Sequence, residues 1–161
     1  MSTPGFLNKL ASASETLTRI TSLPKPVVFT NGVFDVLHRG HVTYLEQARA
    51  LGGSLVVALN TDASAKRLGK GPDRPLNNEL DRAVVMAALA SVSLVTWFDE
   101  DTPLELISVL KPDVLVKGED YDMRKLAETA VVESYGGKAV AIPFVDGYST
   151  SALVQKIRNP A

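Results

Sequence analysis

Residues 30–41 read Thr-Asn-Gly-Val-Phe-Asp-Val-Leu-His-Arg-Gly-His and hold both of the chain's histidines, His38 and His41. The apolar run at 27–30 predicts a buried strand before them, and the segment 41–51 has helical character after them. The two imidazoles therefore fall where a strand passes into a helix. Open α/β sheets bind ligands at the carboxyl ends of their strands. We therefore expect the ligand site of this protein at the end of its first strand.

Strand-like and helix-like segments alternate along the rest of the chain. The strand-like segments are apolar throughout, which is typical of strands buried on both faces of a parallel sheet. Right-handed helical crossovers between such strands give a doubly wound sheet. The predicted fold class is α/β, a Rossmann-like doubly wound five-stranded parallel sheet with strand order 3-2-1-4-5. Strands are expected at 27–30, 54–59, 92–97, 113–116 and 138–142, and helices at 41–51, 77–90, 102–110, 124–135 and 150–158.

An N-terminal amphipathic helix is predicted before the first strand. Apolar residues recur there at alternating spacings that place them on one stripe of a helix. Such a stripe packs either on its own domain or on a second subunit, and we expect a homodimer. The predicted organisation is an N-terminal helical extension at 1–24 followed by a single domain at 25–161. The stripe consists of Phe6, Leu10, Ala13, Leu17 and Ile20.

Composition limits the classes of protein to which the chain can belong. Its 161 residues are 45% hydrophobic, which suffices for one domain with a sizeable core. A formal net charge of −1 is unlike the basic surface typical of nucleic-acid binding, so no nucleic-acid partner is expected. No apolar run approaches the roughly 18 residues of a membrane span, so no membrane partner is expected. The lack of cysteine excludes disulfides and thiolate nucleophiles. The cytoplasm is the expected compartment.

The histidine pair suits an anionic ligand. Both imidazoles can donate hydrogen bonds to phosphate oxygens, and a helix N-terminus adds free N–H groups and a favourable dipole. Gly40 between them lets backbone or ligand approach closely. A metal site formed by Asp35, His38 and His41 is an alternative. Because these spacings do not share one face of a regular helix, no metal held by the protein is predicted, and Mg²⁺ would instead enter bound to a nucleotide.

Further polar residues follow the fourth and fifth predicted strands. The run Ser-Thr-Ser at 149–151 offers hydroxyls and an N-cap at the start of the last helix, which is a second seat for an anion. Lys117 and Arg82 are candidate charge clamps for a phosphate tail. The basic loop 66–74 is either a lid over an anionic substrate or a solvated connection. Its cations are Lys66, Arg67, Lys70 and Arg74.

Two common nucleotide-binding fingerprints are missing from the sequence. No G-x-G-x-x-G follows the first strand, which argues against a dinucleotide-dependent dehydrogenase. No G-x-x-x-x-G-K-[ST] occurs, which argues against a P-loop hydrolase. Binding of phosphate must therefore depend on the histidines.

Residues 32–41 match in full the signature G-x-F-D-x-x-H-x-G-H, so the chain resembles the H-x-G-H nucleotidyltransferase superfamily. The Ser-Thr-Ser run at 149–151 is similar to the second motif of that superfamily. Longer segments most resemble the D-glycero-β-D-manno-heptose 1-phosphate adenylyltransferases, in the form that stands alone without a heptose kinase. Those segments are 30–32, 58–64, 73–75, 99–103, 115–121 and 146–151.

The resemblance implies that the nucleotidyltransferase domain at 25–161 moves AMP from its co-substrate ATP to a heptose 1-phosphate. The products would be pyrophosphate and ADP-heptose, a precursor of the lipopolysaccharide core. The residues implied as catalytic are His38, His41, Arg82 and Lys117. Those implied in nucleotide binding are Thr30, Asn31, Gly32, Phe34, His38, Gly40, His41, Arg82, Lys117, Gly118, Asp120, Tyr148, Ser149, Thr150 and Ser151. Those expected on the sugar phosphate side are Asp35, Asn60, Asp62, Lys66, Lys70 and Arg74.

Two other functions stay open. One is a cytidylyltransferase acting on glycerol 3-phosphate or another polyol phosphate by the same chemistry. Phe144 follows Pro143 where those enzymes usually carry arginine, and this difference favours ATP over CTP. The other is a non-catalytic nucleotide-binding module, against which the intact histidine pair argues.

Overall fold

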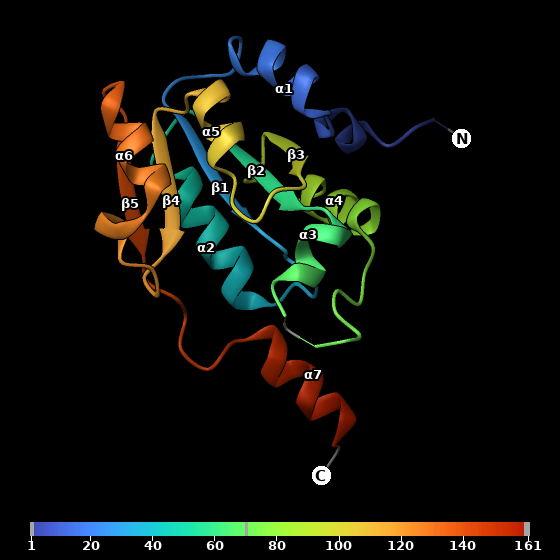
Figure 1. Cartoon of the computed structure of the whole chain (residues 1–161). Helices are drawn as coiled ribbons and strands as arrows, with labels where there is room; N and C mark the ends of the chain where they lie inside the picture. The colour runs from blue at the N-terminus through green and yellow to red at the C-terminus, as the bar shows by residue number, and fades with distance from the viewer. Residues whose placement is uncertain (1, 70, 160–161) are drawn as a thin grey trace.

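The computed structural model describes residues 2–69 and 71–159 and contains the predicted sheet. Its five parallel strands are hydrogen-bonded in the order β3-β2-β1-β4-β5, which confirms the predicted fold (Figure 1). The first strand runs two residues beyond its predicted end, so the signature segment begins on the sheet itself. The strands are β1 (Val27–Gly32), β2 (Ser54–Asn60), β3 (Leu94–Phe98), β4 (Val114–Gly118) and β5 (Lys138–Ile142).

Helices cover both faces of the sheet and enclose two cores. On one face, α2 (Arg39–Arg49) and α4 (Glu79–Ala87) bury their apolar side chains against the strands. On the other face, α5 (Leu104–Leu110) and α6 (Ala127–Ser134) do the same. Successive residues of β1 and β2 alternate between the two cores, because neighbouring side chains of a strand point to opposite faces. Burial on both faces explains why these strands are apolar throughout.

The predicted N-terminal helix is present, but it is shorter than the apolar stripe suggested. A 3-10 helix, η1 (Gly5–Lys9), and an α-helix, α1 (Ala13–Ile20), are separated where Leu10 forms a parallel bridge with Val95 at the edge of β3. Ser12 then caps α1. The apolar stripe is therefore split. Phe6, Leu10 and Ile20 pack on the chain's own cores, whereas Ala13 and Leu17 are exposed.

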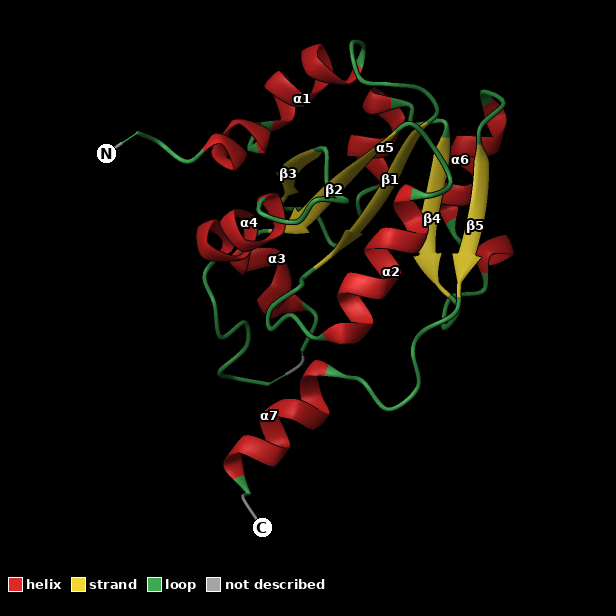
Figure 2. Ribbon diagram, turned by 180° about the vertical axis from the view of Figure 1, so that it is seen from behind, coloured by secondary structure: helices red, strands yellow, loops and turns green. Residues whose placement is uncertain are grey.

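Two short elements lie where the sequence predicted other structure, whereas the last helix spans its predicted range. The helix α3 (Asp62–Arg67) opens the segment expected to be a loop, and the Thr61 side chain caps it by accepting from the Ser64 N–H. A 3-10 turn, η2 (Met123–Lys125), precedes α6, which begins later than predicted. The last helix, α7 (Thr150–Arg158), projects from the body of the molecule and buries none of its residues (Figure 2).

Among the described residues, none of the helices has both the length and the apolar character needed to span a lipid bilayer.

Candidate functional site

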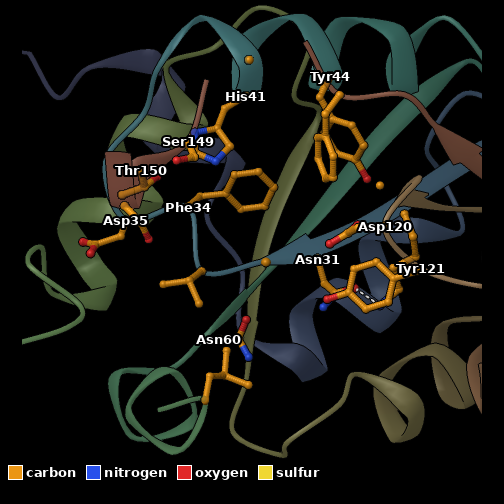
Figure 3. Close-up of a pocket in the computed structure, with 18 of the residues that line it drawn as sticks. Asn31, Phe34, Asp35, His41, Tyr44, Asn60, Asp120, Tyr121, Ser149 and Thr150 are labelled. Carbon is orange, nitrogen blue, oxygen red and sulfur yellow. Dashed lines mark hydrogen bonds between the residues drawn. The ribbon is translucent and has the colours of Figure 1, made fainter. Parts of the chain in front are cut away.

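A cavity of about 530 Å³ opens at the carboxyl ends of the central strands, where the topology predicted the site (Figure 3). Its walls come from the β1–α2 loop, the end of β2, the segment after β4 and the start of α7. Most of the predicted site residues meet there. They are Asn31, Gly32, Phe34, Asp35, His38, Gly40, His41, Asn60, Arg74, Lys117, Gly118, Asp120, Tyr148, Ser149, Thr150 and Ser151.

The two histidines lie together at the N-terminus of α2. His38 is the N-cap residue with an extended backbone, His41 belongs to the first turn, and their rings stack with centroids 3.9 Å apart. Phe34 meets the His41 ring edge-on at 5.3 Å. Gly40 makes this packing possible, because a Cβ there would lie 3.1 Å from both the His38 ring and the Cβ of Tyr148. The spacing of the motif thus builds a compact imidazole pair at a helix N-terminus.

Burial affects the charge of His38. Desolvation lowers the pKa of His38 below its usual value. Its Nδ1 is buried without a hydrogen-bond partner among the described residues. An anion that enters the cavity would favour the protonated imidazole, because an opposite charge nearby stabilises the charged form. The site therefore suits a phosphate group that brings its own negative charge.

A second helix N-terminus faces the same cavity. The Ser149 hydroxyl caps α7 by accepting from the Ala152 N–H at 3.0 Å. Thr150 donates its hydroxyl to the Val36 carbonyl at 3.2 Å, which ties α7 to the β1–α2 loop. Figure 3 shows Ser149 and Thr150 beside His41. Two positive helix ends thus converge on one space, an arrangement that suits a chain of phosphates.

Asp35 lines the cavity, but its carboxylate is already fully engaged. It accepts from the N–H groups of Leu76 and Asn77 at 2.9 Å and from Arg74 Nε at 2.7 Å, with only 1% of its side chain exposed. Burial alone would raise the pKa of Asp35, but the two N–H groups and the Arg74 guanidinium hold it below its usual value. Asp35 therefore fixes the loop that follows α3. It is not free to join His38 in a metal site.

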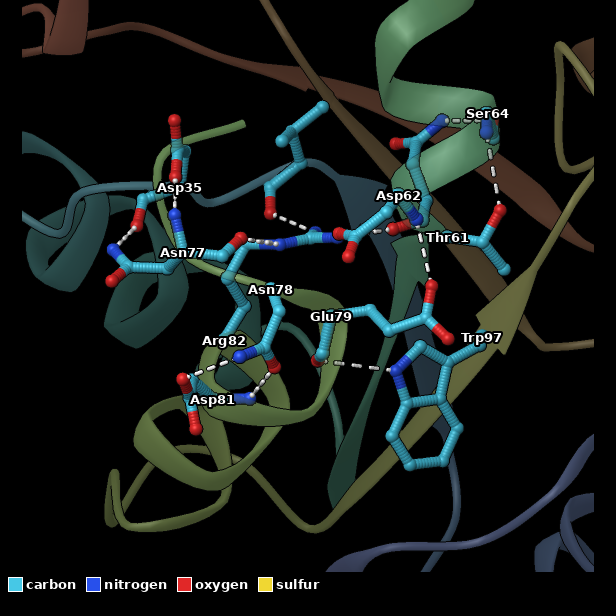
Figure 4. A network of polar contacts seen from close by, with 12 residues as sticks. Asp35, Thr61, Asp62, Ser64, Asn77, Asn78, Glu79, Asp81, Arg82 and Trp97 are labelled. Atoms are coloured by element: carbon cyan, nitrogen blue, oxygen red, sulfur yellow. Dashed lines mark hydrogen bonds and ion pairs between the residues drawn. The ribbon is translucent and has the colours of Figure 1, made fainter. Parts of the chain in front are cut away.

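The predicted phosphate clamp Arg82 is turned into the protein (Figure 4). Its fully buried guanidinium donates to the carbonyls of Asn77, Val33 and Asn60 at 2.7–3.0 Å. It also donates to Asp62 Oδ1 at 2.8 Å. Neither Arg82 nor Asp62 lines the cavity, so the structure does not bring either of them to the site. This arginine joins α4 to the ends of β1 and β2. That role could not be predicted, because a buried and an exposed arginine look alike in a sequence.

The basic segment 66–74 divides into parts with different surroundings. Lys66 and Arg67 form the last turn of α3, and neither lines the cavity. Arg67 donates to Asp101 Oδ1 at 2.7 Å. Arg74 reaches the cavity but binds Asp35. Lys70 lies outside the described residues.

The opposite wall of the cavity is formed around Lys117. Its Nζ donates to Asn31 Oδ1 at 2.6 Å. Gly118 leaves room for Phe144, since a Cβ at Gly118 would lie 2.0 Å from the Phe144 ring. Thr30 lies behind this wall and does not line the cavity. It donates to the Val116 carbonyl at 3.0 Å.

Several cavity residues were missed by the reasoning from sequence. Tyr44 could have been found, because it follows His41 by three residues and so shares its helix face. Its hydroxyl lies 2.7 Å from that of Thr30. Tyr121 and the loop 101–103 lie within two of the segments that resemble the adenylyltransferases, but neither was assigned to the site. Glu128 also lines the cavity and follows no pattern that the sequence reveals.

Comparisons with known proteins show the family to which the chain is related. The model of the cytidylyltransferase-like family matches residues 29–156. The D-beta-D-heptose 1-phosphate adenylyltransferase of Bordetella bronchiseptica is 60% identical over 161 residues, which cover 99% of each chain. The bifunctional protein HldE of Hahella chejuensis is 54% identical over 133 residues. They cover 83% of this chain but only 28% of that longer protein.

Solved structures share the fold. The lipopolysaccharide core biosynthesis protein of Thermoplasma volcanium superposes with a TM-score of 0.61 at 28% identity, over 76% of this chain and 98% of that one. Pantoate-beta-alanine ligase of Francisella tularensis gives a TM-score of 0.58 at 15% identity, over 83% of this chain and 66% of that one, and shows the fold alone. From its sequence match and its paired histidines at the end of the first strand, the chain belongs to the cytidylyltransferase-like family.

Proposed function

We propose that this protein is an adenylyltransferase that moves AMP from ATP to D-glycero-β-D-manno-heptose 1-phosphate, with release of pyrophosphate. The observation that carries the chemistry is the stacked histidine pair at the N-terminus of α2, facing the N-terminus of α7 across one cavity. The full-length similarity to the Bordetella enzyme supports the choice of nucleotide and acceptor.

In the proposed reaction, a phosphate oxygen of the sugar attacks the α-phosphorus of ATP in line with the leaving group. A P–O bond forms to the acceptor while the bond to pyrophosphate breaks, so no covalent enzyme intermediate is needed. The protein must hold two anions in register and stabilise the charge that builds on the transferring group. His38 and His41 would donate to the α-phosphate and the departing oxygens. The α7 N-terminus, with Ser149 to Ser151, would bind the rest of the triphosphate.

We propose that Mg²⁺ reaches the cavity as part of the ATP complex. Among the described residues, no group of three or more histidine, cysteine or acidic side chains is arranged to hold a metal. Triphosphate oxygens are suitable ligands for this ion. When bound, it would reduce the negative charge that the two substrates bring together.

The acceptor is proposed to bind on the β2 side of the cavity. Asn60 ends β2 and lines the cavity, and Arg74 approaches it from the following loop. Asp35 would act there by holding Arg74 rather than by touching the sugar phosphate. Closure of the segment 66–74 over the acceptor remains a prediction.

A cytidylyltransferase that acts on a polyol phosphate is the second candidate. Phe144 argues for ATP, because its ring occupies the space above Gly118 and lies 6.1 Å from the Tyr44 ring. An arginine at this position would instead offer donors to a base. Pyrophosphate release should be measured with ATP and CTP, each paired with heptose 1-phosphate and with glycerol 3-phosphate. We expect the highest kcat/KM for ATP with the heptose. A higher value for CTP would overturn the choice of nucleotide, and binding without turnover would indicate a non-catalytic module.

A homodimer and a cytoplasmic location are also proposed, and each needs its own experiment. Most of the stripe that suggested self-association packs on the chain's own domain, but Leu17 stays exposed beside Val109 in a shallow groove. Light scattering should give a mass above that of the 17.3 kDa monomer. A monomer at micromolar concentration would contradict the dimer. Fractionation of cells that express the protein would test its location.

A further inference from the structure

A buried ion pair forms part of the cavity wall. Lys117 Nζ on β4 lies 3.7 Å from Glu128 Oε1 in the first turn of α6. The side chains are only 7% and 6% exposed, yet both residues line the cavity. The Lys117 ammonium also donates to Asn31 Oδ1 at 2.6 Å. It is thus held between a neutral amide from β1 and a carboxylate from α6.

The surroundings of Lys117 set two effects against each other. Burial lowers the pKa of Lys117, and the negative charge of Glu128 opposes that fall. Asn31 can fix the position of the ammonium but supplies no charge. Asp120 also contributes a negative charge, but its residue is exposed, and Tyr121 presents its ring 5.6 Å from Nζ. Glu128 is therefore the buried negative charge that Lys117 contacts.

Stability alone gives little reason for such a pair. A buried ion pair loses about as much in desolvation as it gains from attraction, and apolar residues of similar volume often serve the fold equally well. A charged lysine in the wall of an anion-binding site can, however, contribute to ligand binding. It would attract the nucleotide and offset part of its charge.

We propose that Glu128 is a positioning residue for the reaction: its buried carboxylate keeps Lys117 charged and directs the ammonium into the cavity. This inference rests on the proposed function for its ligand, a nucleoside triphosphate. Glu128 acts through Lys117 and needs no contact with substrate. Its role is specific to charge, so the amide of glutamine cannot replace it.

The experiment compares wild type with Glu128→Gln, Glu128→Asp and the matched control Glu133→Gln, which removes an exposed carboxylate from the same helix. The titration of Lys117 is followed directly by NMR of ¹³C-labelled lysine, and its signal is identified by its loss in Lys117→Met. The dissociation constant of ATP is measured by calorimetry over the same pH range.

The pKa of Lys117 should fall by about one pH unit or more in Glu128→Gln, by less in Glu128→Asp, and not at all in Glu133→Gln. Removing a negative charge lowers a lysine pKa, so loss of ATP affinity with rising pH should begin at a lower pH in Glu128→Gln. Just above the shifted pKa, that variant should bind ATP up to about tenfold more weakly than wild type.

An unchanged Lys117 pKa in Glu128→Gln would overturn the inference, as would ATP affinity with the same pH dependence as wild type. If circular dichroism shows that Glu128→Gln does not fold, Glu128→Asp decides by the same two criteria. Neither measurement requires turnover. A lowered Lys117 pKa with weakened ATP binding but no pyrophosphate release would therefore refute the proposed reaction and leave the role of Glu128 intact.

Discussion

Two regions of this molecule carry charged or titratable side chains near the cavity and use them in opposite ways. In the β1–α2 region, His38 and His41 stack at a helix N-terminus and line the cavity. In the loop after α3 and in α4 itself, Arg74 and Arg82 bind groups of the protein itself. Residue type alone therefore does not identify a charged side chain that binds a ligand. What matters is whether the fold already supplies its partners.

The largest expected effect comes from breaking the network of Arg82. Arg82→Met would leave the carbonyls of Val33 and Asn60 without their donor and Asp62 without its partner. We expect the free energy of unfolding to fall by about 3–5 kcal/mol in urea denaturation. Arg82→Lys should recover only part of it, because an ammonium cannot reproduce the fork of a guanidinium. If Arg82→Met is stable and only its KM for ATP is raised, that result would instead support the role of Arg82 in phosphate binding that was expected from the sequence.

Variants of the histidine pair should lose turnover and keep their stability, the reverse of the Arg82 variants. His38→Ala and His41→Ala are each expected to lower kcat by about 10²–10³-fold, the usual loss for one donor to the transition state. Thermal unfolding should stay close to that of wild type, because these side chains serve the cavity more than the core. Single-turnover kinetics would separate the chemical step from ATP binding. Turnover close to normal in both variants would remove them from the mechanism.

A smaller effect is expected from the basic segment 66–74. Neutralising Lys66, Lys70 and Arg74 together should raise the KM for sugar phosphate by about tenfold, and more than the KM for ATP. Lys66→Ala alone tests the lid without disturbing Asp35, because only Arg74 binds that carboxylate among the described cations of the segment. Proteolysis within 66–74 should also slow when sugar phosphate binds. Equal cleavage with and without the acceptor would make the segment a simple connection.

The smallest expected effect is on stability in acid. His38 and Asp35, one from each region's contacts, should affect the free energy of unfolding in different pH ranges. Burial lowers the pKa of His38, so just below its usual value of about 6.5 the unfolded chain binds a proton that the folded chain does not. Stability should therefore fall as the pH drops through that range. Asp35 has a lowered pKa, and its contribution is lost only as the pH falls below about 3.9. In His38→Gln, the Tm should depend less on pH in the upper range. If the Tm of His38→Gln depends on pH as that of wild type does, His38 is not the group responsible for the loss of stability in this range.

The sheet and its order were predictable because they follow from patterns that act over many residues. Apolar strands at regular intervals leave few alternatives once crossovers are right-handed. The N-terminal helix was predicted, but its length was overestimated for a local reason. The periodic stripe from Phe6 to Ile20 ignored the backbone pairing of Leu10 with the edge strand, which interrupts the helix. Pairing between distant segments leaves no periodic trace in the sequence.

The site was predictable where a motif fixes local geometry and much less so where contacts are distant. His38, Gly40 and His41 lie within one turn, so their spacing determines how they meet. Arg82 donates to Val33, 49 residues away, and Lys117 donates to Asn31, 86 residues away. No property of the sequence around Arg82 shows that three carbonyls surround its guanidinium. Distant partners of this kind can be identified only from the three-dimensional structure.

The projecting helix α7 has a consequence for how the site is completed. A helix of nine residues with no buried side chain is short for stability on its own, since isolated helices below about 12 residues are barely stable in water. Yet its first turn forms one wall of the cavity. A phosphate bound there would add to the few contacts that order the helix. The amide hydrogens of α7 should then exchange with solvent faster than those of β1, and slow down most when nucleotide binds. At α7, the binding of substrate is thus coupled to the folding of the helix that forms part of the binding site.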